Sequence, residues 1–573
     1  MDRTSDFGSD SEGSNPSLVT KKTPNFRCFF YFLRKLFYLS QYFIQIDNNM
    51  RKISTLSLAA FVFSTQMAIA QGPMQQQPEK LQPIVESIVK EVNDNSQLEV
   101  LATELLDGIG PRLMGTPGMQ QANDWAVEKM KNWGIEAFNQ QYGTWKGWER
   151  GITHVDMTYP RVKSLTAMQL AWSPATKKPV EAEVVVLPKV ADKAAFDKWL
   201  PSVKGKIVLV AQHQKVGRPD YQLKEFATAE TYDKLKKQID DDAKAYREYF
   251  KTVGYDNNSL IEALEKSGAA GIAISNWTGI MGANRIFGAK TKAIPMIDIE
   301  VEDYGMLYRL AENGKKPKIK VETQSKVLPT AKAFNTIGMI KGKEKPEEYV
   351  ILSAHLDSWD GAQGATDNGT GTITMLEVMR ILKKYYPNNK RTIVVGLWGG
   401  EEQGLNGSRG FVYDNPEIIK GTQAVFNQDN GTGRVVNISG QGFKNSYDYM
   451  TRWLSAVPKK VRDHIKTDYP GMPGGGGSDH ASFVAAGVPG FSLSSLNWGY
   501  FGYTWHTTKD TYDKVVFDEI KNNVILTATL AYMASEDPEF ANRDKRAMPT
   551  GNNGKVVEWP AVREPARDSD KYK

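Results

Sequence analysis

Apolar runs and helical patterns alternate along the C-terminal half of the chain. Apolar residues that recur at three and four positions predict helices over 370–385 and 515–534. Short apolar runs predict strands at 349–354, 392–398, 422–427 and 489–493. Because helices between strands are typical of parallel sheets, we predict an α/β fold whose mostly parallel central sheet is flanked by helices.

The pattern changes over 181–330. Short strand-like runs at 183–187 and 206–210 are followed by a charged, helix-prone stretch at 223–251. These features predict an inserted domain of mixed α/β structure at 181–330, which makes the main domain discontinuous. The predicted segments of the main domain are 91–180 and 331–540, with an irregular C-terminal tail at 541–573.

Residues 50–70 have the layout of a secretory signal peptide. Two basic residues precede an apolar stretch, and small residues at its end supply a cleavage point. Because signal peptides begin at the initiator, we expect Met50 to be the true start and 1–49 to be a mis-assigned upstream extension. The mature chain would then begin with a flexible lead-in at 71–90 and be exported to the periplasm or the extracellular space.

If residues 1–49 are translated instead, the stretch 26–46 forms a basic, aromatic segment suited to a membrane surface. Arg34 and Lys35 in its middle argue against a membrane span. The sequence contains no run of about 18 or more apolar residues, the length that a spanning helix needs. We therefore expect no stable membrane span in the mature form.

The charge and cysteine content narrow the chemistry. The net charge is +6 over 573 residues, a weak basic balance. Nucleic-acid binding needs a concentrated basic face, and we expect no nucleic-acid partner. Cys28 is the one cysteine of the sequence, so intrachain disulfides and cysteine-based zinc sites are excluded. Any metal ion must be bound by carboxylates and by some of the six histidines.

Candidate metal ligands follow the predicted strands, one after another. In open α/β sheets, ligands bind beyond the carboxyl ends of the strands. His355 follows the first strand, and Glu402 and Asp429 follow the next two. Asp367 precedes the helix at 370–385, and His506 lies beyond the last strand. We expect these five side chains to converge on one crevice.

Two histidines and three carboxylates suit two divalent ions, for which zinc is the natural choice. Asp367 has glycines on both sides and is the expected bridge, about 3.5–4 Å separating the two ions. His355 and Asp429 would complete one site, Glu402 and His506 the other. A water shared by both ions would have its pKa lowered from 15.7 towards about 7, which yields a bridging hydroxide.

Two further acids complete the predicted site. Glu401 is adjacent to a ligand but free of the metal, so we assign it as the general base that passes the water's proton to the leaving amine. Asp357 comes two residues after His355 and can accept the second ring N–H of that histidine.

With these motifs the sequence resembles the co-catalytic dizinc exopeptidases, a family of secreted bacterial aminopeptidases and plasma glutamate carboxypeptidases. It is most similar to the carboxypeptidase Q type, from about residue 98 to 536. The motifs that carry the resemblance are His355-Leu356-Asp357-Ser358-Trp359-Asp360, the loop around Asp367, Gly400-Glu401-Glu402-Gln403-Gly404, Asp429, Ser478-Asp479-His480 with Gly487-Val488-Pro489, Gly110-Pro111-Arg112-Leu113 and Trp148-Glu149-Arg150-Gly151.

The resemblance implies the same ligand assignments, two Zn²⁺ per chain, Glu401 as base, and a short peptide as substrate. It also implies that 181–330 is a protease-associated (PA) domain. Some relatives place a tyrosine before Ser-Asp-His to stabilise the oxyanion, but this chain has four glycines at 474–477, which leaves the oxyanion donor open. Whether the enzyme is an aminopeptidase, a carboxypeptidase or a dipeptidase is also open.

Two other functions compete with a peptidase. One is a single-zinc aminoacyl transferase of the glutaminyl cyclase kind, which needs fewer ligands. The other is a receptor-like protein that kept the fold and lost its metals, which should show substitutions among the ligands.

Other motifs carry less weight. Ser478, Asp479 and His480 are consecutive and cannot form a catalytic relay, so a structural role for His480 is expected. The aromatic run 498–505 fits a substrate pocket, core packing or a homodimer contact. The remaining histidines, His154, His213 and His464, are expected to be ordinary surface or loop residues.

Overall fold

The computed structural model describes residues 79–571 except residue 553. The predicted upstream extension 1–49, the predicted signal peptide 50–70 and Cys28 lie outside these residues. Part of the predicted lead-in is helical, because helix α3 spans Pro83–Asp94. Its proline at the helix start and its buried stripe of Val85, Ile88 and Val92 explain why the irregular part ends before residue 90.

The main domain is built on one sheet whose middle strands are parallel, as predicted. Its strand order is β13-β12-β14-β11-β9-β10-β8, and beyond β8 the same sheet continues through β4-β5-β6-β7-β3. Neighbours from β14 to β10 pair in parallel, whereas β8 pairs antiparallel with β10. The bounds are β8 Lys318–Ile340, β9 Lys345–His355, β10 Arg391–Trp398, β11 Thr422–Asn427, β12 Val435–Ser439, β13 Lys466–Asp468 and β14 Gly490–Ser495.

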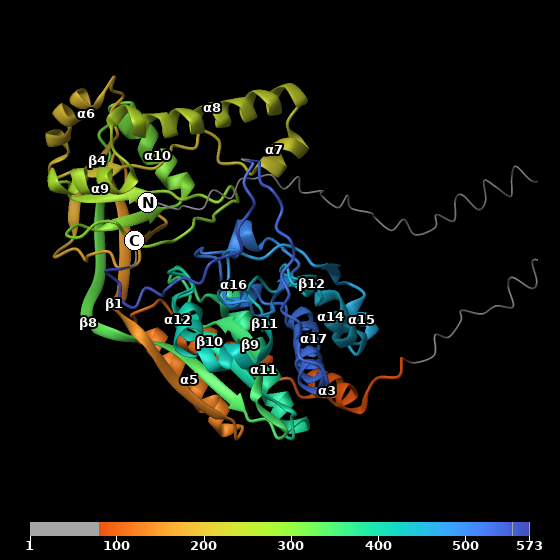
Figure 1. Ribbon diagram of the computed structural model, residues 1–573. Helices are drawn as coiled ribbons and strands as arrows, with labels where there is room; N and C mark the ends of the chain where they lie inside the picture. The colour runs from red at the N-terminus through yellow and green to blue at the C-terminus, as the bar shows by residue number, and fades with distance from the viewer. Residues whose placement is uncertain (1–78, 553, 572–573) are drawn as a thin grey trace, which may run out of the picture. The chain divides into compact units, whose positions relative to one another are not determined.

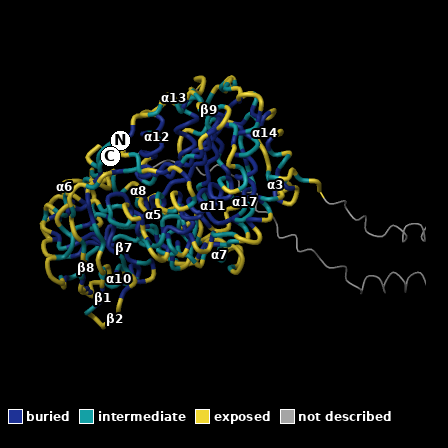
Figure 2. The backbone as a smooth tube through the Cα atoms, turned by 90° about the horizontal axis from the view of Figure 1, so that it is seen from below, coloured by how far each residue is buried: buried dark blue, intermediate teal, exposed yellow. Residues whose placement is uncertain are grey.

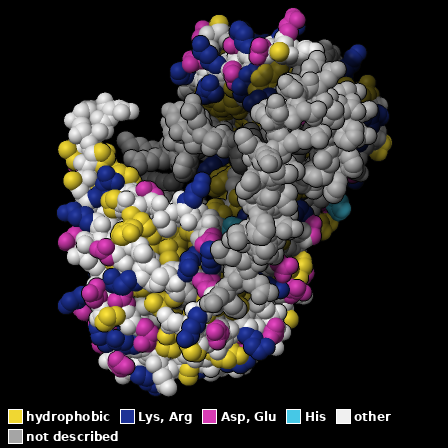
Figure 3. Space-filling model, turned by 90° about the vertical axis from the view of Figure 1, so that its right-hand side faces the viewer, with side chains coloured by type: hydrophobic (Ala, Val, Ile, Leu, Met, Phe, Trp, Pro, Cys, Tyr) yellow, Lys and Arg dark blue, Asp and Glu magenta, His cyan; other side chains and the backbone are white. Residues whose placement is uncertain are grey.

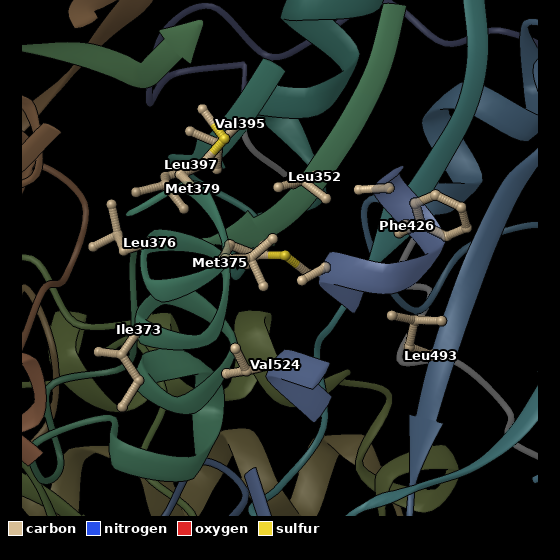
Figure 4. Close-up of a cluster of buried hydrophobic side chains, with 14 of the residues drawn as sticks. Leu352, Ile373, Met375, Leu376, Met379, Val395, Leu397, Phe426, Leu493 and Val524 are labelled. Atoms are coloured by element: carbon tan, nitrogen blue, oxygen red, sulfur yellow. The ribbon is translucent and has the colours of Figure 1, made fainter. Parts of the chain in front are cut away.

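Helices cover both faces of this sheet. Alternate residues of the strands point to opposite sides, so Val350 and Leu352 of β9 pack in a different cluster from Ile351. Figure 4 shows Leu352, Val395 and Leu397 close to methionines of α11. The backbone around β9 and α11 is largely buried (Figure 2). The helices of the main domain are α4 Leu98–Ala102, α5 Pro117–Asn132, α11 Thr370–Tyr385, α12 Asn406–Asp414, α13 Pro416–Gly421, α14 Ser446–Ser455, α15 Lys459–Arg462, α16 His480–Ala485 and α17 Phe517–Glu536.

Two long strands were not anticipated from the sequence. Strand β1, Glu136–Tyr159, pairs antiparallel with β8 along most of its length (Figure 1). Its burial pattern is irregular, and the register shifts at several points, for example between Gln141 and Gly143. A strict apolar–polar alternation is therefore missing, which is why the period-2 signal is weak.

The segment between these long strands has a second parallel set of strands, β4 to β7. Two separate apolar clusters cover its two faces. Its elements are β2 Lys163–Ser164, β3 Ala167–Gln169, β4 Val180–Val186, α6 Lys193–Trp199, β5 Ile207–Leu209, α7 Asp220–Phe226, α8 Ala229–Val253, α9 Asn257–Lys266, β6 Gly271–Ile274, β7 Met296–Ile299 and α10 Val301–Glu312. The arrangement is mixed α/β. That it is a PA domain stays a prediction.

The distribution of surface charge and the length and polarity of the helices match what the sequence predicts. In the coloured part of the face in Figure 3, basic and acidic side chains are interspersed. Throughout the described residues, each helix is too short or too polar to traverse a bilayer. Among the described residues after α17 there is no helix or extended strand, only isolated bridges such as Thr550 with Val556.

A buried ion-pair cluster fixes α3 to α11. Glu91 accepts hydrogen bonds from Arg380 at 2.7 Å, from Lys384 at 2.9 Å and from Tyr385 at 2.8 Å. Burial alone would raise the pKa of Glu91, but these donors outweigh it and lower the pKa from 4.5 to about 2. A carboxylate with a lowered pKa stabilises the fold above its unfolded pKa, and this contribution is lost as the pH falls towards the folded value.

We expect Glu91→Gln to lower the free energy of unfolding by about 3 kcal/mol at pH 7, because the buried charge that binds both Arg380 and Lys384 is lost and only Glu377 remains as a charged partner of Arg380. The difference between wild type and variant should shrink as the pH falls from 4.5 to about 2. Urea unfolding at pH 7, 4 and 3 measures it. Glu86→Gln, an exposed position on the same helix, is the control. A difference that does not depend on pH contradicts the assignment.

Candidate metal centre

The parallel strands bring the predicted ligands to one edge of the sheet. His355 is the last residue of β9, which lies between β10 and β11. Glu402 follows β10 and Asp429 follows β11, so both lie near the carboxyl end of β9. The turn before α11 supplies Asp367, and the loop after β14 supplies His506. All five predicted ligands therefore lie together.

They form two groups that share Asp367. In the first group, Nε2 of His355 lies 3.3 Å from Oδ1 of Asp367 and 3.1 Å from Oδ1 of Asp429. In the second group, Nε2 of His506 lies 3.1 Å from Oδ2 of Asp367 and 2.9 Å from Oε2 of Glu402. One carboxylate thus presents a separate oxygen to each group.

These distances fit the donor spacing of a divalent ion. Donors at about 2.0 Å from a tetrahedral ion are about 3.3 Å apart. Within the described residues, Oε1 of Glu402 is buried without a hydrogen-bond partner. Burial would lower the pKa of His506, but Glu402 and Asp367 outweigh it and raise the pKa to about 9. The carboxylates therefore favour a positive charge here, which a divalent cation supplies.

Asp367 is positioned by residues that sequence reasoning missed. Asp510 is buried and accepts hydrogen bonds from the backbone N–H groups of Thr366, at 2.7 Å, and of Asp367, at 3.1 Å. Arg112 is fully buried and donates to the carbonyl oxygens of Leu356 at 2.7 Å and Gly364 at 2.8 Å. Arg112 belongs to a motif of the resemblance, but nothing in its sequence context indicates which loops it joins.

Asp357 links the two halves of the site. Its carboxylate accepts the backbone N–H of Glu401 at 3.1 Å and of Glu402 at 3.2 Å. Nδ1 of His355 lies 2.9 Å from the carbonyl oxygen of Asp357 and 3.6 Å from its carboxylate. The acceptor nearest to the histidine is therefore the main chain of Asp357, and the carboxylate holds the Glu401–Glu402 turn.

Glu401 lies next to the first group but belongs to neither. Burial raises its pKa, His355 opposes the rise, and the carboxylates of Asp429 and Asp479 add to it. Bound cations would act in the opposite direction and favour the carboxylate form. A half-buried carboxylate next to the two metal-binding groups, and not itself a member of either, is suited to accept a proton.

Aromatic rings enclose His506. Trp505 stacks on the imidazole, with ring centroids 3.8 Å apart, and Phe287 packs edge-on at 5.2 Å. The carbonyl of His506 accepts the N–H of Ile286 at 2.7 Å. Segment 181–330 therefore contacts the loop that carries a predicted ligand. Two other members of the aromatic run are half exposed, Trp498 at 58% and Phe501 at 54%, whereas Tyr500 is buried.

The remaining predicted positions have structural or surface environments, except for His213, which is half-buried. Ser478 accepts a hydrogen bond from Asn427 at 2.7 Å, and burial lowers the pKa of His480 to about 4, so that it is neutral. His154 and His464 are exposed. His213 is half-buried and stacks on Tyr308.

Known proteins match this chain in sequence and in structure. Residues 335–531, which include every predicted ligand, match peptidase family M28. The match supports a zinc metallopeptidase, and the M28 segment coincides with the strands and loops that build the two groups.

The similarity extends beyond the M28 segment. Carboxypeptidase Q of Rattus norvegicus is 27% identical over 77% of this chain and 85% of its own length. Among solved structures, a peptidase M28 precursor from Shewanella amazonensis covers 80% of this chain and 97% of its own, with 23% identity and a TM-score of 0.58. A zinc aminopeptidase from Bacillus subtilis covers 85% and 100%, with 17% identity and a TM-score of 0.50. The two structures show the fold.

Proposed function

We propose that the protein is an exported dizinc metallo-exopeptidase that hydrolyses dipeptides or short peptides. One observation carries the proposal. Asp367 presents one oxygen to each of two histidine–carboxylate groups, which is the arrangement that two neighbouring ions require. Zinc suits the imidazole and carboxylate donors, and the zinc aminopeptidase with the same fold supports that choice.

When bound, two zinc ions lower the pKa of water and neutralise charge that develops on the carbonyl oxygen of the peptide. His355 and Asp429 would bind one ion, and Glu402 and His506 the other. Glu401 then takes the proton of the attacking water and passes it to the leaving amine. Asp357 holds the Glu401 backbone, so that the base and the adjacent ligand keep a fixed separation.

The two competing functions have less support. A single-zinc aminoacyl transferase needs only one of the two groups, whereas both are present here. A receptor-like protein that had lost its metals should show substitutions among the five predicted ligands, and all five are present here. The PA identity of 181–330 and the export of the chain are parts of this proposal that rest on the sequence resemblance and on residues 50–70.

We propose that a pocket whose lining includes Arg409, Arg563 and Glu558 binds the C-terminal end of the substrate. The pocket shares no residue with the two metal-binding groups, and Arg409 interacts electrostatically with Glu401. Arg409 of α12 lines a cavity of about 270 Å³ together with Leu405 and Gly475. Its guanidinium is half-buried and, among the described residues, has no ion pair or hydrogen bond. Burial lowers its pKa, and the nearby Arg563 lowers it further. Arginine recognises carboxylates through paired hydrogen bonds. We therefore place the free C-terminal carboxylate of the substrate here, as in a carboxypeptidase or dipeptidase.

Replacing Arg409 by glutamine is expected to raise KM for a dipeptide with a free C-terminus by about 10-fold to 100-fold, because a hydrogen bond to a charged group contributes about 1.5–3 kcal/mol. Steady-state kinetics measures the effect. Arg247→Gln, an exposed arginine on α8, is the matched control. An unchanged KM in Arg409→Gln would place the carboxylate elsewhere.

Blocked peptides test the direction of cleavage. The zinc-loaded protein should hydrolyse a dipeptide with both ends free and should not hydrolyse one with an amidated C-terminus. Hydrolysis of the N-terminally acetylated form as well identifies a carboxypeptidase, and its loss identifies a dipeptidase. Cleavage that survives only the C-terminal block means an aminopeptidase. No hydrolysis of any form by protein with two bound ions would overturn the exopeptidase proposal.

A further inference from the structure

A second cavity lies in the segment 181–330, at the carboxyl ends of β4 and β5. Its volume is about 390 Å³, within the range of small-molecule pockets. Helix α8 contributes Tyr246 and Tyr249, helix α10 contributes Tyr308, and the loop after β5 contributes His213. Its lining shares no residue with either metal-binding group.

Two polar atoms of this cavity have unused hydrogen-bonding capacity. Tyr246 donates its hydroxyl hydrogen to the carbonyl of Val210 at 2.7 Å. By contrast, within the part of the chain that the structure describes, Oη of Tyr249 and Nε2 of His213 are buried and have no partner. An unmade hydrogen bond of a buried group costs about 1–3 kcal/mol, so a bound molecule that reaches these atoms recovers that energy.

The walls of the cavity are flat and aromatic. The rings of His213 and Tyr308 stack with centroids 4.4 Å apart and an angle of 17°. Leu187 and Leu209 add apolar surface. Burial, together with nearby Arg309, lowers the pKa of His213, so the imidazole is neutral at pH 7 and its Nε2 can accept or donate according to the tautomer. A planar ring that carries a polar group fits these walls.

Charges of both signs stand at the rim. Lys189 pairs with Glu312 at 3.0 Å, and Lys215 pairs with Asp242 at 2.9 Å. All four line the cavity. Exposed ion pairs contribute little to stability, about 0–1 kcal/mol, so each partner can turn to an incoming charge at low cost. An ammonium and a carboxylate on the same small molecule would find a counter-charge here.

We propose that this cavity is a binding site for a free aromatic amino acid whose ring carries a hydrogen-bonding group, such as tryptophan or tyrosine. The ring packs against the wall formed by the tyrosines and the stacked His213. Its polar atom bonds to Oη of Tyr249 or Nε2 of His213, and the side chain must turn towards the cavity because both atoms are buried in this structure. The ammonium and carboxylate groups remain at the rim. Recognition at this site is independent of the metal centre and of the substrate that the metal centre cleaves.

Isothermal titration calorimetry with L-tryptophan and the full chain tests the site. We expect binding that persists after zinc is removed by a chelator, because the metal centre takes no part. Tyr249→Phe and His213→Leu should together weaken the binding of L-tryptophan by about 10-fold or more, since each deletes one partner of a buried hydrogen bond. Tyr249→Phe alone should leave the affinity for L-phenylalanine nearly unchanged, because the ring of L-phenylalanine has no polar atom that could bond to Oη of Tyr249.

Tyr221→Phe, whose side chain is 57% exposed, is the matched control and should bind as wild type. Thermal unfolding of each variant shows that the fold is kept. Three results would overturn the proposal: no binding of L-tryptophan, binding that chelation abolishes, or binding of equal strength in wild type and in the double variant.

Discussion

Replacing Glu401 by glutamine is expected to lower kcat for a short peptide by a factor of about 10²–10⁴, the usual contribution of a general base. Glutamine has the same shape but cannot accept the proton of the attacking water. The two metal-binding groups do not include Glu401, so the variant should bind as many zinc ions as the wild type. Steady-state kinetics and metal analysis of the same preparation measure both quantities.

The combination of the two readouts decides the role of Glu401. Lost activity with unchanged zinc content is the result expected of a base. Lost activity together with lost zinc would make Glu401 a ligand instead. Glu417→Gln, on the short helix α13 away from the ligands, is a control that should leave both quantities unchanged.

Replacing Asp367 by alanine is expected to remove both zinc ions and to lower hydrolysis by about 10³-fold or more, since two-metal catalysis supplies several kcal/mol. The reason is its geometry, because Oδ1 faces His355 and Oδ2 faces His506. Asp429→Ala should behave differently and cost one ion, because Asp429 contacts only the His355 group. Metal analysis after dialysis measures the content.

The number of zinc ions lost from each of these two variants tests whether Asp367 bridges the two sites. A loss of one ion from both variants would contradict a bridging Asp367. Asp518→Ala, whose side chain is 91% exposed, is the control for the handling of the protein.

The parallel strands and the ligand positions could be predicted because the signals are local. The strand at 422–427 and the helix at 370–385 have the predicted bounds in the structure. Buried parallel strands are nearly continuous apolar runs, and their carboxyl ends meet at one edge, so the residue after each run is a candidate ligand. His355 ends its strand, and Glu402 and Asp429 lie within four residues of the ends of theirs.

The residues that hold the ligands could not be predicted in the same way. Arg112 and Asp510 act through hydrogen bonds to loops far away in the sequence, and no local pattern reports such partners. Strands β1 and β8 are stabilised by pairing with each other and have irregular burial. The bond from His355 to the main chain of Asp357 likewise depends on a turn that only the fold defines.

The central claim is that two zinc ions act together at Asp367. The most direct measurement is the hydrolysis of an unblocked dipeptide by chelated protein as zinc is added back in known amounts. We predict no activity at the start and a rise that ends at two zinc ions per chain. A rise that ends at one ion per chain, or activity that survives complete removal of the metal, would contradict the account.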